Sequence, residues 1–170
     1  EACLAHDLGN PPFGHSGEKA IGTYFSEGKG QVLRSEMSDE EWEDLTHFEG
    51  NANAFRLLTH QFEGRRKGGF VMTYSTLASI VKYPFSSQLA GKKQKFGFFT
   101  TETDAYKRIA DELGIIRLSP LNEPPRYARY PLVYLVEAAD DICYQVMDIE
   151  DAHKLKILTT EETKSLFLGF

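Results

Sequence analysis

The chain has 170 residues, 41% of them hydrophobic, which is enough for one sizeable core and makes a single domain the expectation. Its formal charge of −6 argues against a protein whose whole surface binds nucleic acid, although it leaves room for a local basic groove. No stretch reaches the roughly 18 to 20 apolar residues that cross a bilayer, and no signal peptide is visible, so a cytoplasmic protein is the expectation.

The first expected element is the end of a helix over residues 1–6, which the Gly-Asn-Pro-Pro break at residues 9–12 cannot continue. On a strand, neighbouring side chains point to opposite faces, but at a helix end the imidazole of His6 and the carboxylate of Asp7 can converge on one metal ion. Taken alone, such a pair is more often a chance helix cap than a pair of ligands. Support for a metal site must therefore come from the residues that follow.

A second helix is expected from about Gly14 to Phe25. His15 and Glu18 lie three residues apart in its first turns, so they share a face, and the carboxylate can hold the imidazole in one tautomer and favour its protonated form. This pairing is typical of acid–base catalysis, and the alternative is that His15 is simply a loop histidine. A His-Asp pair followed by a His-Glu pair suits a metal site with a proton donor facing it.

The segment from Ser26 to Asp44 is an acidic, glycine-bearing insert and the part of the chain most open to flexibility. A helix is expected from about Gly50 to Thr59. His47 lies just ahead of it and is a third candidate for the active site, although a surface histidine is an equally good interpretation. The remaining histidines, His60 and His153, are expected at the surface.

Two shorter helices are predicted in the middle of the chain. Thr73 to Lys82 reads as an amphipathic helix ended by Tyr83-Pro84, and Asp104 to Leu113 as a helix with Gly114 as its stop. Between them, residues 85–99 form a loop of glycine, lysine and aromatic residues without a clear period.

The longest predicted helix runs from Pro131 to about Lys156, where apolar residues recur at helical spacing. Asp140, Tyr144 and Asp148 lie at positions i, i+4 and i+8, on one stripe about 12 Å long. Two carboxylates and a phenol amid apolar neighbours are costly to bury unless something binds them, whereas an exposed acidic face carries no such cost. Because the His-Asp pair supplies only two metal ligands, the first interpretation is favoured.

Two smaller features complete the pattern. A final helix is expected from Thr160 to Leu168, with Thr160 as its N-cap. Cys3 and Cys143 both lie in apolar helical stretches and are expected to be reduced thiols in the core, since an extracellular disulfide scaffold uses cysteine differently.

Together these motifs resemble the deoxyguanosine triphosphate triphosphohydrolases, the dNTPase branch of the HD-domain metal phosphohydrolases. The resemblance rests first on the string His-Asp-Leu-Gly-Asn-Pro-Pro-Phe-Gly-His-Ser-Gly-Glu at residues 6–18, and it extends from Glu1 to about Asp151. Further matching segments follow in the family's order: Phe48-Glu49-Gly50-Asn51-Ala52, Met72-Thr73-Tyr74-Ser75-Thr76-Leu77, Lys82-Tyr83-Pro84 and Ala139-Asp140-Asp141-Ile142-Cys143-Tyr144.

The resemblance implies an all-α fold, an HD-domain helical bundle with long irregular loops, in which residues 1–170 form a single HD-type phosphohydrolase domain. It implies that His6, Asp7 and Asp140 bind a divalent metal, Mn²⁺ or Mg²⁺. Asp140 is preferred over the adjacent Asp141 because it matches the family position and shares the helical stripe. The family's site uses one more histidine upstream of the His-Asp pair, so the chain is expected to be a fragment that lacks the N-terminal part carrying it.

The activity that the resemblance implies is hydrolysis of deoxynucleoside triphosphates, dGTP first among them, to a deoxynucleoside and tripolyphosphate. A metal-activated water attacks the α-phosphorus, and His15 with Glu18 protonates the leaving 5′-oxygen. A histidine near the position of His47 lines the same site in related enzymes. Substrate contacts are implied for four further residues: Tyr144 against the deoxyribose, Asp148 at the sugar hydroxyl, Lys82 near the phosphates and Tyr83 near the base.

A bound triphosphate also needs cations around it, because several negative charges must be matched once water is excluded. A partner subunit or an upstream arginine is a further source of such charge. In this chain the candidates are Arg56, Arg65, Arg66, Lys67, Lys82 and the run Lys92-Lys93-Gln94-Lys95, which is more simply interpreted as a solvated loop.

Two other functions stay open: another HD-domain nucleotide phosphohydrolase, and a non-catalytic domain that senses nucleotides or single-stranded DNA. A pure binding module has no need of a proton donor such as the His15–Glu18 pair, which favours an enzyme. Related enzymes assemble as oligomers, and some respond to a second nucleotide or to single-stranded DNA. The resemblance therefore implies a homo-oligomer, with an allosteric dNTP or single-stranded DNA as further partners and no membrane.

Overall fold

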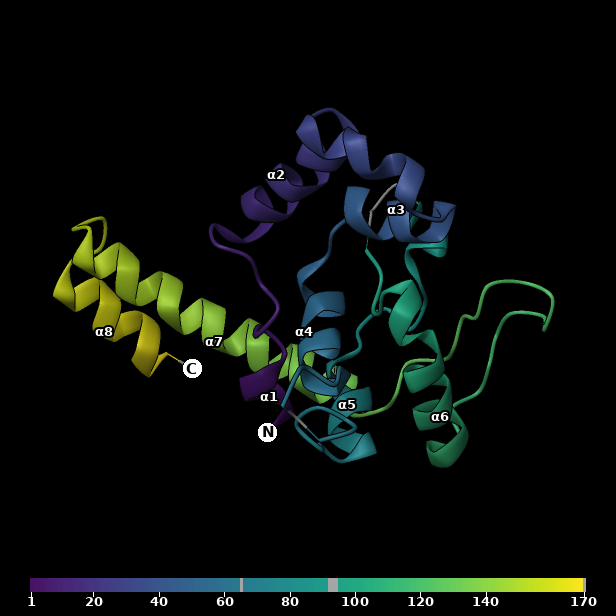
Figure 1. Cartoon of the computed structure of the whole chain (residues 1–170). Helices are drawn as coiled ribbons and strands as arrows, with labels where there is room; N and C mark the ends of the chain where they lie inside the picture. The colour runs from purple at the N-terminus through teal and green to yellow at the C-terminus, as the bar shows by residue number, and fades with distance from the viewer. Residues whose placement is uncertain (65, 92–94, 170) are drawn as a thin grey trace. The chain divides into compact units, whose positions relative to one another are not determined.

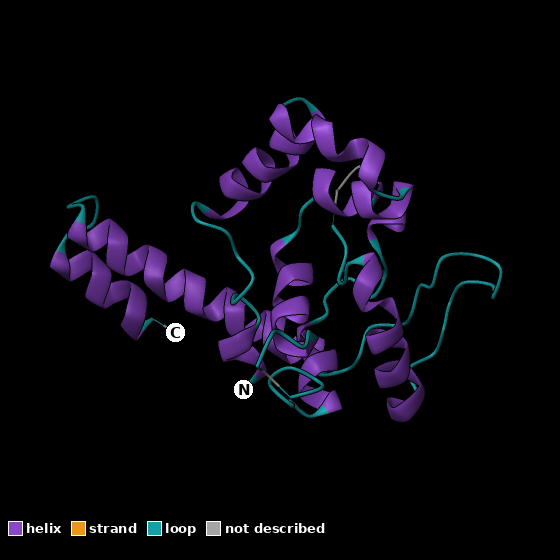
Figure 2. Cartoon of the chain, in the orientation of Figure 1, coloured by secondary structure: helices purple, strands orange, loops and turns teal. Residues whose placement is uncertain are grey.

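The computed structural model describes residues 1–64, 66–91 and 95–169, and over these ranges the regular structure is helical (Figures 1 and 2). Among the described residues, β-structure is limited to two isolated bridges, Phe85 with Arg126 and Arg117 with Tyr127. The predicted all-α fold is confirmed, whereas its assignment to the HD-domain bundle stays a prediction.

The chain divides into two compact units, residues Glu1–Val133 and Tyr134–Phe170, and each is described by itself. The expectation of a single domain over residues 1–170 stays a prediction. The first unit holds α1 (Ala2–Ala5), α2 (Gly14–Ser26), η1 (Lys29–Glu36), α3 (Asp39–Thr46), α4 (Gly50–Thr59), α5 (Tyr74–Ile80), η2 (Ser87–Leu89), η4 (Thr100–Glu102) and α6 (Thr103–Leu113).

The core of the first unit lies between α4, α5 and α6, which bury one side each. Tyr106 of α6 stacks on Phe98 with 4.8 Å between the ring centroids and meets Phe55 of α4 edge-on at 5.8 Å. All three rings are fully buried. Ala5 of α1 is buried in the same cluster, so the residue that precedes His6 is fixed to the core.

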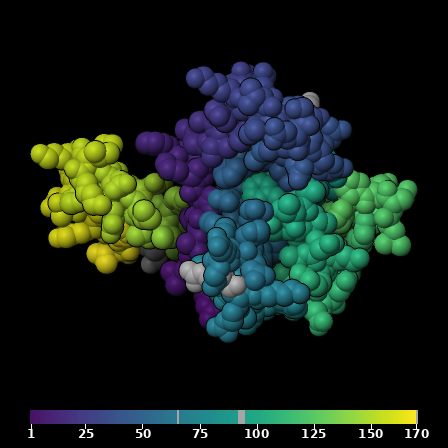
Figure 3. Space-filling model, viewed as in Figure 1, coloured from purple at the N-terminus to yellow at the C-terminus, as the bar shows by residue number. Residues whose placement is uncertain are grey.

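A second layer of the first unit consists of α2, η1 and α3, and Figure 3 shows it in purple and blue over the teal residues of the same unit. Gly22 lets α2 approach α3 closely, because a Cβ atom there would lie 2.5 Å from the carbonyl oxygen of Thr46. Phe25 and Trp42 meet edge-on across the two helices. The segment over residues 26–44, expected to be an insert without helices, folds into η1 and most of α3.

The start of α3 explains why this segment is helical. Ser38 is the N-cap and forms a capping box with Glu41, in which each side chain accepts a hydrogen bond from the backbone N–H of the other. Three acidic residues of the insert, Asp39, Glu40 and Glu41, lie in the first turn of α3, where negative charge is favourable. Composition suggested flexibility, but the same acidic residues begin a helix.

The second unit is built from α7 (Val133–Lys154), whose first residue belongs to the first unit, and α8 (Thr160–Leu168). Both helices were predicted, but the N-cap of α8 is Thr159 and not Thr160. Thr159 forms a capping box with Glu162. In the described ranges, no helix combines the length and the apolar character needed to cross a membrane.

Both cysteines carry free thiols, and both are exposed. The expectation that Cys3 and Cys143 lie in the core is wrong, because α1 and α7 present these positions to the surface. Of the two histidines expected at the surface, His153 is exposed, whereas His60 is half-buried with its ring against Phe62.

Candidate active site

The loop that carries the His-Asp pair is attached to α4 at Gly9. A Cβ atom at this position would lie 2.1 Å from the backbone nitrogen of Ala54 and from the carbonyl oxygen of Gly50, so only glycine permits the contact. The side-chain amide of Asn53 donates a hydrogen bond of 2.9 Å to the carbonyl oxygen of Gly9. The sequence therefore fixes this loop on the buried helix of the core.

His6 caps the C-terminal end of α1, as the sequence predicts. Its Nδ1 lies 2.8 Å from the carbonyl oxygen of Cys3. A carbonyl oxygen only accepts hydrogen bonds, so Nδ1 carries a proton and Nε2 is the nitrogen turned toward Asp7. Nε2 lies 3.5 Å from Oδ2 of Asp7, close enough for both atoms to contact one ion.

Asp7 is oriented by the loop itself. The side-chain amide of Asn10 donates a hydrogen bond of 2.8 Å to Oδ1 of Asp7, the oxygen that is not turned toward His6. An imidazole in a fixed tautomer and a carboxylate held by an amide form a donor set that suits a divalent transition metal or Mg²⁺. The two residues therefore fit the predicted metal.

The third predicted ligand lies in the second unit. Asp140 is half-buried on α7, and Tyr144 and Asp148 follow it at four-residue spacing. Tyr144 and Asp148 are exposed, which agrees with the open alternative of an exposed acidic face. That these three residues join the His-Asp pair stays a prediction.

The acid–base pair of the sequence analysis is formed. Nδ1 of His15 lies 2.7 Å from Oε2 of Glu18 and donates to it, because an ionised carboxylate can only accept. The side chain of His15 is 84% exposed and that of Glu18 only 11%. The carboxylate is thus fixed in the protein, while the imidazole reaches solvent.

Glu18 is held by more than its histidine. Its Oε1 accepts a hydrogen bond of 2.7 Å from the backbone N–H of Gly50, the first residue of α4, and Nζ of Lys95 lies 3.5 Å from Oε2. Burial alone would raise the pKa of Glu18, but the hydrogen bonds from His15 and Gly50, together with the charges of Lys95 and His15, lower it. Glu18 therefore stays ionised beside His15.

Glu49 is a further acidic residue of the site, and its role was not predicted from the sequence. It is buried and caps α4, because its carboxylate accepts hydrogen bonds from the backbone N–H groups of Asn51 and Ala52. Lys95 forms an ion pair with it at 2.7 Å. An acid before the first turn of a helix is a readable capping signal, but nothing near Lys95 in the sequence indicates its partners.

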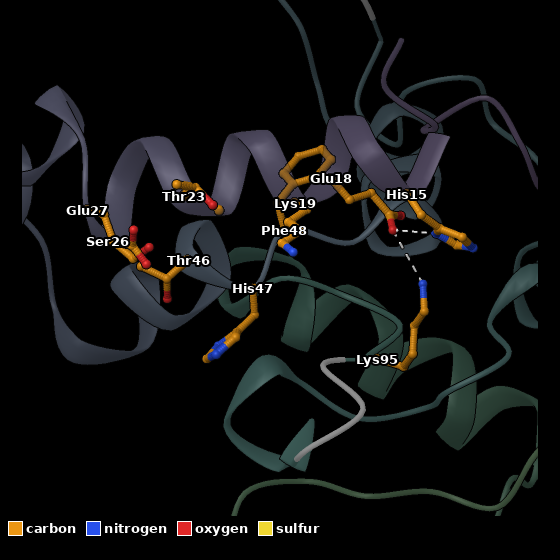
Figure 4. A pocket seen from close by; sticks show the side chains of 11 residues that line it. His15, Glu18, Lys19, Thr23, Ser26, Glu27, Thr46, His47, Phe48 and Lys95 are labelled. Carbon is orange, nitrogen blue, oxygen red and sulfur yellow. Dashed lines mark hydrogen bonds and ion pairs between the residues drawn. The ribbon is translucent and has the colours of Figure 1, made fainter. Parts of the chain in front are cut away.

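A pocket of about 510 Å³ is lined by His15, Glu18, Lys95 and His47, together with residues of α2 (Figure 4). His47 caps α3, and its Nδ1 lies 2.8 Å from Oε2 of Glu43. Figure 4 shows the ring of His47 directed away from the group of His15, Glu18 and Lys95. The structure thus brings the three candidates for acid–base chemistry to one pocket without joining His47 to the pair.

The other predicted contacts lie elsewhere. Lys82 and Tyr83 are half-buried in the loop after α5 and do not belong to the described lining of this pocket. Arg56 forms an ion pair with Glu102 at 2.8 Å and a hydrogen bond to Thr101, so its charge is neutralised within the fold. Arg66 and Lys67 are exposed. Arg65, Lys92, Lys93 and Gln94 lie outside the described residues.

Comparison with known proteins identifies relatives over almost the whole chain, although no family model matches it. The chain is 48% identical over 99% of its length to a deoxyguanosinetriphosphate triphosphohydrolase-like protein of Pseudomonas aeruginosa. It is 43% identical over 92% of its length to a protein of the same name from Synechocystis. It is also 33% identical over 95% of its length to a deoxyguanosinetriphosphate triphosphohydrolase of Yersinia enterocolitica.

The chain spans 38%, 38% and 35% of these three relatives, respectively, so it corresponds to a part of each. The similarity to the Pseudomonas protein includes the His-Asp and His-Glu pairs, since it covers 99% of the chain. By this similarity the chain belongs to the family of the deoxyguanosinetriphosphate triphosphohydrolases and their triphosphohydrolase-like relatives.

Proposed function

We propose that the protein containing this chain hydrolyses deoxynucleoside triphosphates, with dGTP as the first substrate to test, to a deoxynucleoside and tripolyphosphate. The observation that carries the proposal is the pair of His15 and Glu18, with a hydrogen bond of 2.7 Å and the histidine exposed at a pocket. The names of the relatives support the same reaction class.

His15 is the proposed general acid. Its Nδ1–H is occupied by Glu18, so the second ring nitrogen, Nε2, faces outward from the pair. A protonated imidazole next to a fixed carboxylate can donate a proton to a leaving 5′-oxygen, and such catalysis contributes about 10² to 10⁴ in rate. Glu18 keeps the ring in one orientation and stabilises its positive charge.

His6 and Asp7, joined by Asp140, are proposed to bind Mn²⁺ or Mg²⁺. Such an ion, when bound, supplies an activated water and neutralises phosphate charge. The chain's own contribution is to orient the ligands: the Cys3 carbonyl fixes the tautomer of His6, and Asn10 holds Asp7.

The remaining substrate contacts are proposed on the family resemblance. Tyr144 would contact the deoxyribose and Asp148 would accept a hydrogen bond from its hydroxyl, while Lys82 would lie near the phosphates and Tyr83 near the base. His47 would contribute to the same active site from the described pocket. A homo-oligomer, a cytoplasmic location, and regulation by dNTP or single-stranded DNA belong to the same proposal.

Phosphorus NMR of the products tests the reaction. The full-length protein that contains this chain is incubated with Mn²⁺ and dGTP, then with each other dNTP. Tripolyphosphate and deoxynucleoside are expected, and His15→Ala should lower the rate by about 10² or more. His153→Ala, at an exposed histidine of α7, is the matched control and should keep the rate.

Two results would contradict the proposal. Orthophosphate or pyrophosphate as the product would assign the protein to another branch of nucleotide phosphohydrolases. Bound nucleotide without any product would favour a sensing domain, in which case the His15 variant would bind nucleotide as the unchanged protein does.

A further inference from the structure

Two carboxylates converge on the first turn of α4. The backbone N–H of Gly50 donates to Glu18, while those of Asn51 and Ala52 donate to Glu49. The N-terminus of a helix favours negative charge. Two carboxylates at one helix end nevertheless repel each other, which favours protonation or movement of one of them.

Lys95 lies between these two carboxylates. Its Nζ is 2.7 Å from Oε1 of Glu49 and 3.5 Å from Oε2 of Glu18, the same oxygen that accepts the hydrogen bond from His15. Figure 4 shows the lysine side chain extending toward Glu18 from the opposite side of the pocket. Only 27% of the Lys95 side chain is exposed.

We propose that Lys95 is a positioning residue for the acid–base pair: it holds Glu18 in the orientation in which Oε2 faces Nδ1 of His15. The kinetic part of this inference rests on the proposed function, whereas the arrangement of Glu18 does not. Lys95 acts through Glu18, so its side chain need not touch the substrate.

The difference between the two carboxylates decides which one depends on Lys95. Glu49 is buried and is fixed by two backbone N–H groups and by the side-chain amide of Asn51. Glu18 has one backbone N–H group, that of Gly50, besides His15. When the lysine charge is removed, Glu18 is the group with fewer fixed partners, so it is the one that moves or takes up a proton.

The charged groups around Glu18 support its dependence on Lys95. The groups that face it are His15 from its own helix, the N-terminus of α4, and Lys95 from the loop before η4, with Glu49 behind the lysine. The charge of Lys95 contributes to the lowered pKa of Glu18. Burial would lower the pKa of Lys95, but the hydrogen bond and charge of Glu49 and the charge of Glu18 raise it, so the lysine stays charged.

The experiment uses the full-length protein with Lys95→Met, Lys95→Arg, Glu49→Gln and the double variant Lys95→Met/Glu49→Gln. Lys107→Met, at an exposed lysine of α6, is the matched control. The titration of the Glu18 carboxyl is followed by ¹³C NMR of glutamate labelled at Cδ, with Glu18→Gln to assign the signal. The kcat and KM for dGTP are measured against pH.

Lys95→Met is expected to lower kcat at least about tenfold with KM nearly unchanged, because it disturbs proton transfer and not substrate binding. It should also move the Glu18 titration and the acid limb of the kcat profile to higher pH. Lys95→Arg should keep kcat and the Glu18 titration close to those of the wild type. Lys107→Met should change neither kcat nor the titration.

Glu49→Gln tests whether Lys95 positions Glu18 or only neutralises the buried carboxylate of Glu49. If Lys95 acts on Glu18, Lys95→Met should shift the Glu18 titration and lower kcat in the Glu49→Gln protein, as it does in the wild type. Recovery of full kcat and of the Glu18 titration in the double variant would overturn the proposal, because Lys95 would then serve Glu49 alone. A higher KM at constant kcat would also overturn it, since it would indicate a direct phosphate contact.

The failure of the proposed function is distinguishable from the failure of this inference. If neither the wild type nor any variant has dNTPase activity, the proposed function is refuted. The Glu18 titration then still decides whether Lys95 positions Glu18. An unchanged Glu18 titration in a folded Lys95→Met protein would refute the positioning role, whatever the activity.

Discussion

Replacing Gly9 with alanine tests whether the loop that carries His6 and Asp7 is fixed on α4. The new Cβ would lie 2.1 Å from two backbone atoms of α4, whereas ordinary contact begins at 3.4 Å, so the loop must move outward by about 1.3 Å. Such overpacking typically costs about 1–3 kcal/mol, and weakening the bond between Asn53 and Gly9 adds about 1 kcal/mol.

The displacement should also separate the ligands of the proposed metal. Because Asp7 and Asn10 lie within two residues of Gly9, the affinity for Mn²⁺ is expected to fall about 10- to 100-fold, as it does when the groups that orient metal ligands are lost. Urea unfolding followed by the fluorescence of Trp42, the single tryptophan of the chain, gives the stability. Titration calorimetry with Mn²⁺ gives the affinity.

Gly114→Ala is the matched control for Gly9→Ala. Gly114 ends α6 with a φ of 64° and has open space around its Cβ position, so alanine costs about 1 kcal/mol through backbone strain alone. It should lower stability without changing Mn²⁺ affinity. Wild-type stability and affinity in Gly9→Ala would refute the close contact between the loop and α4.

Three further outcomes are expected. Asn10→Ala should weaken Mn²⁺ binding about tenfold in calorimetry, because Asp7 loses the amide that orients it, and equal affinity would show that the amide has no such role. Tyr106→Phe should leave the free energy of unfolding unchanged or raise it by up to about 1 kcal/mol, since the buried hydroxyl has no described hydrogen-bond partner. A loss of more than about 1 kcal/mol in urea unfolding would instead indicate that a buried water binds this hydroxyl. The folded-state pKa of Glu18 lies below its ordinary value of 4.5, so its contribution to stability is present above that pH and is lost as the pH falls through the lower folded-state pKa. Urea unfolding of Glu18→Gln across this range should therefore show a weaker pH dependence than the wild type, and identical pH dependence would contradict the assignment.

The helices were predictable where the sequence marks both of their ends. The bounds of α4 and α8 match the predicted ranges, because an acid or threonine precedes each first turn and a clear break follows. The N-cap of α8 was misplaced by one residue, although the spacing of Thr159 and Glu162 fits a capping box. The same signature at Ser38 and Glu41 marks the helix that was missed in the insert.

The candidate site was predictable only in its local parts. His15 and Glu18 are three residues apart on one helix, so spacing alone predicts their contact. Lys95 is far from Glu18 and Glu49 along the chain, and its role depends on a tertiary contact that no local pattern records. The thiols of Cys3 and Cys143 were misplaced for a similar reason: apolar neighbours predict a helix but do not fix which face is covered.

The way α4 begins has a consequence for hydrogen exchange. The first N–H groups of a helix have no intrahelical acceptor and usually exchange rapidly with solvent. In this protein the amides of Gly50, Asn51 and Ala52 donate to the carboxylates of Glu18 and Glu49. Their protection therefore reports the state of the two acids and not the length of the helix. Slow exchange at Gly50 would mean that Glu18 is in place, so one backbone amide can monitor the position of this carboxylate without substrate or metal.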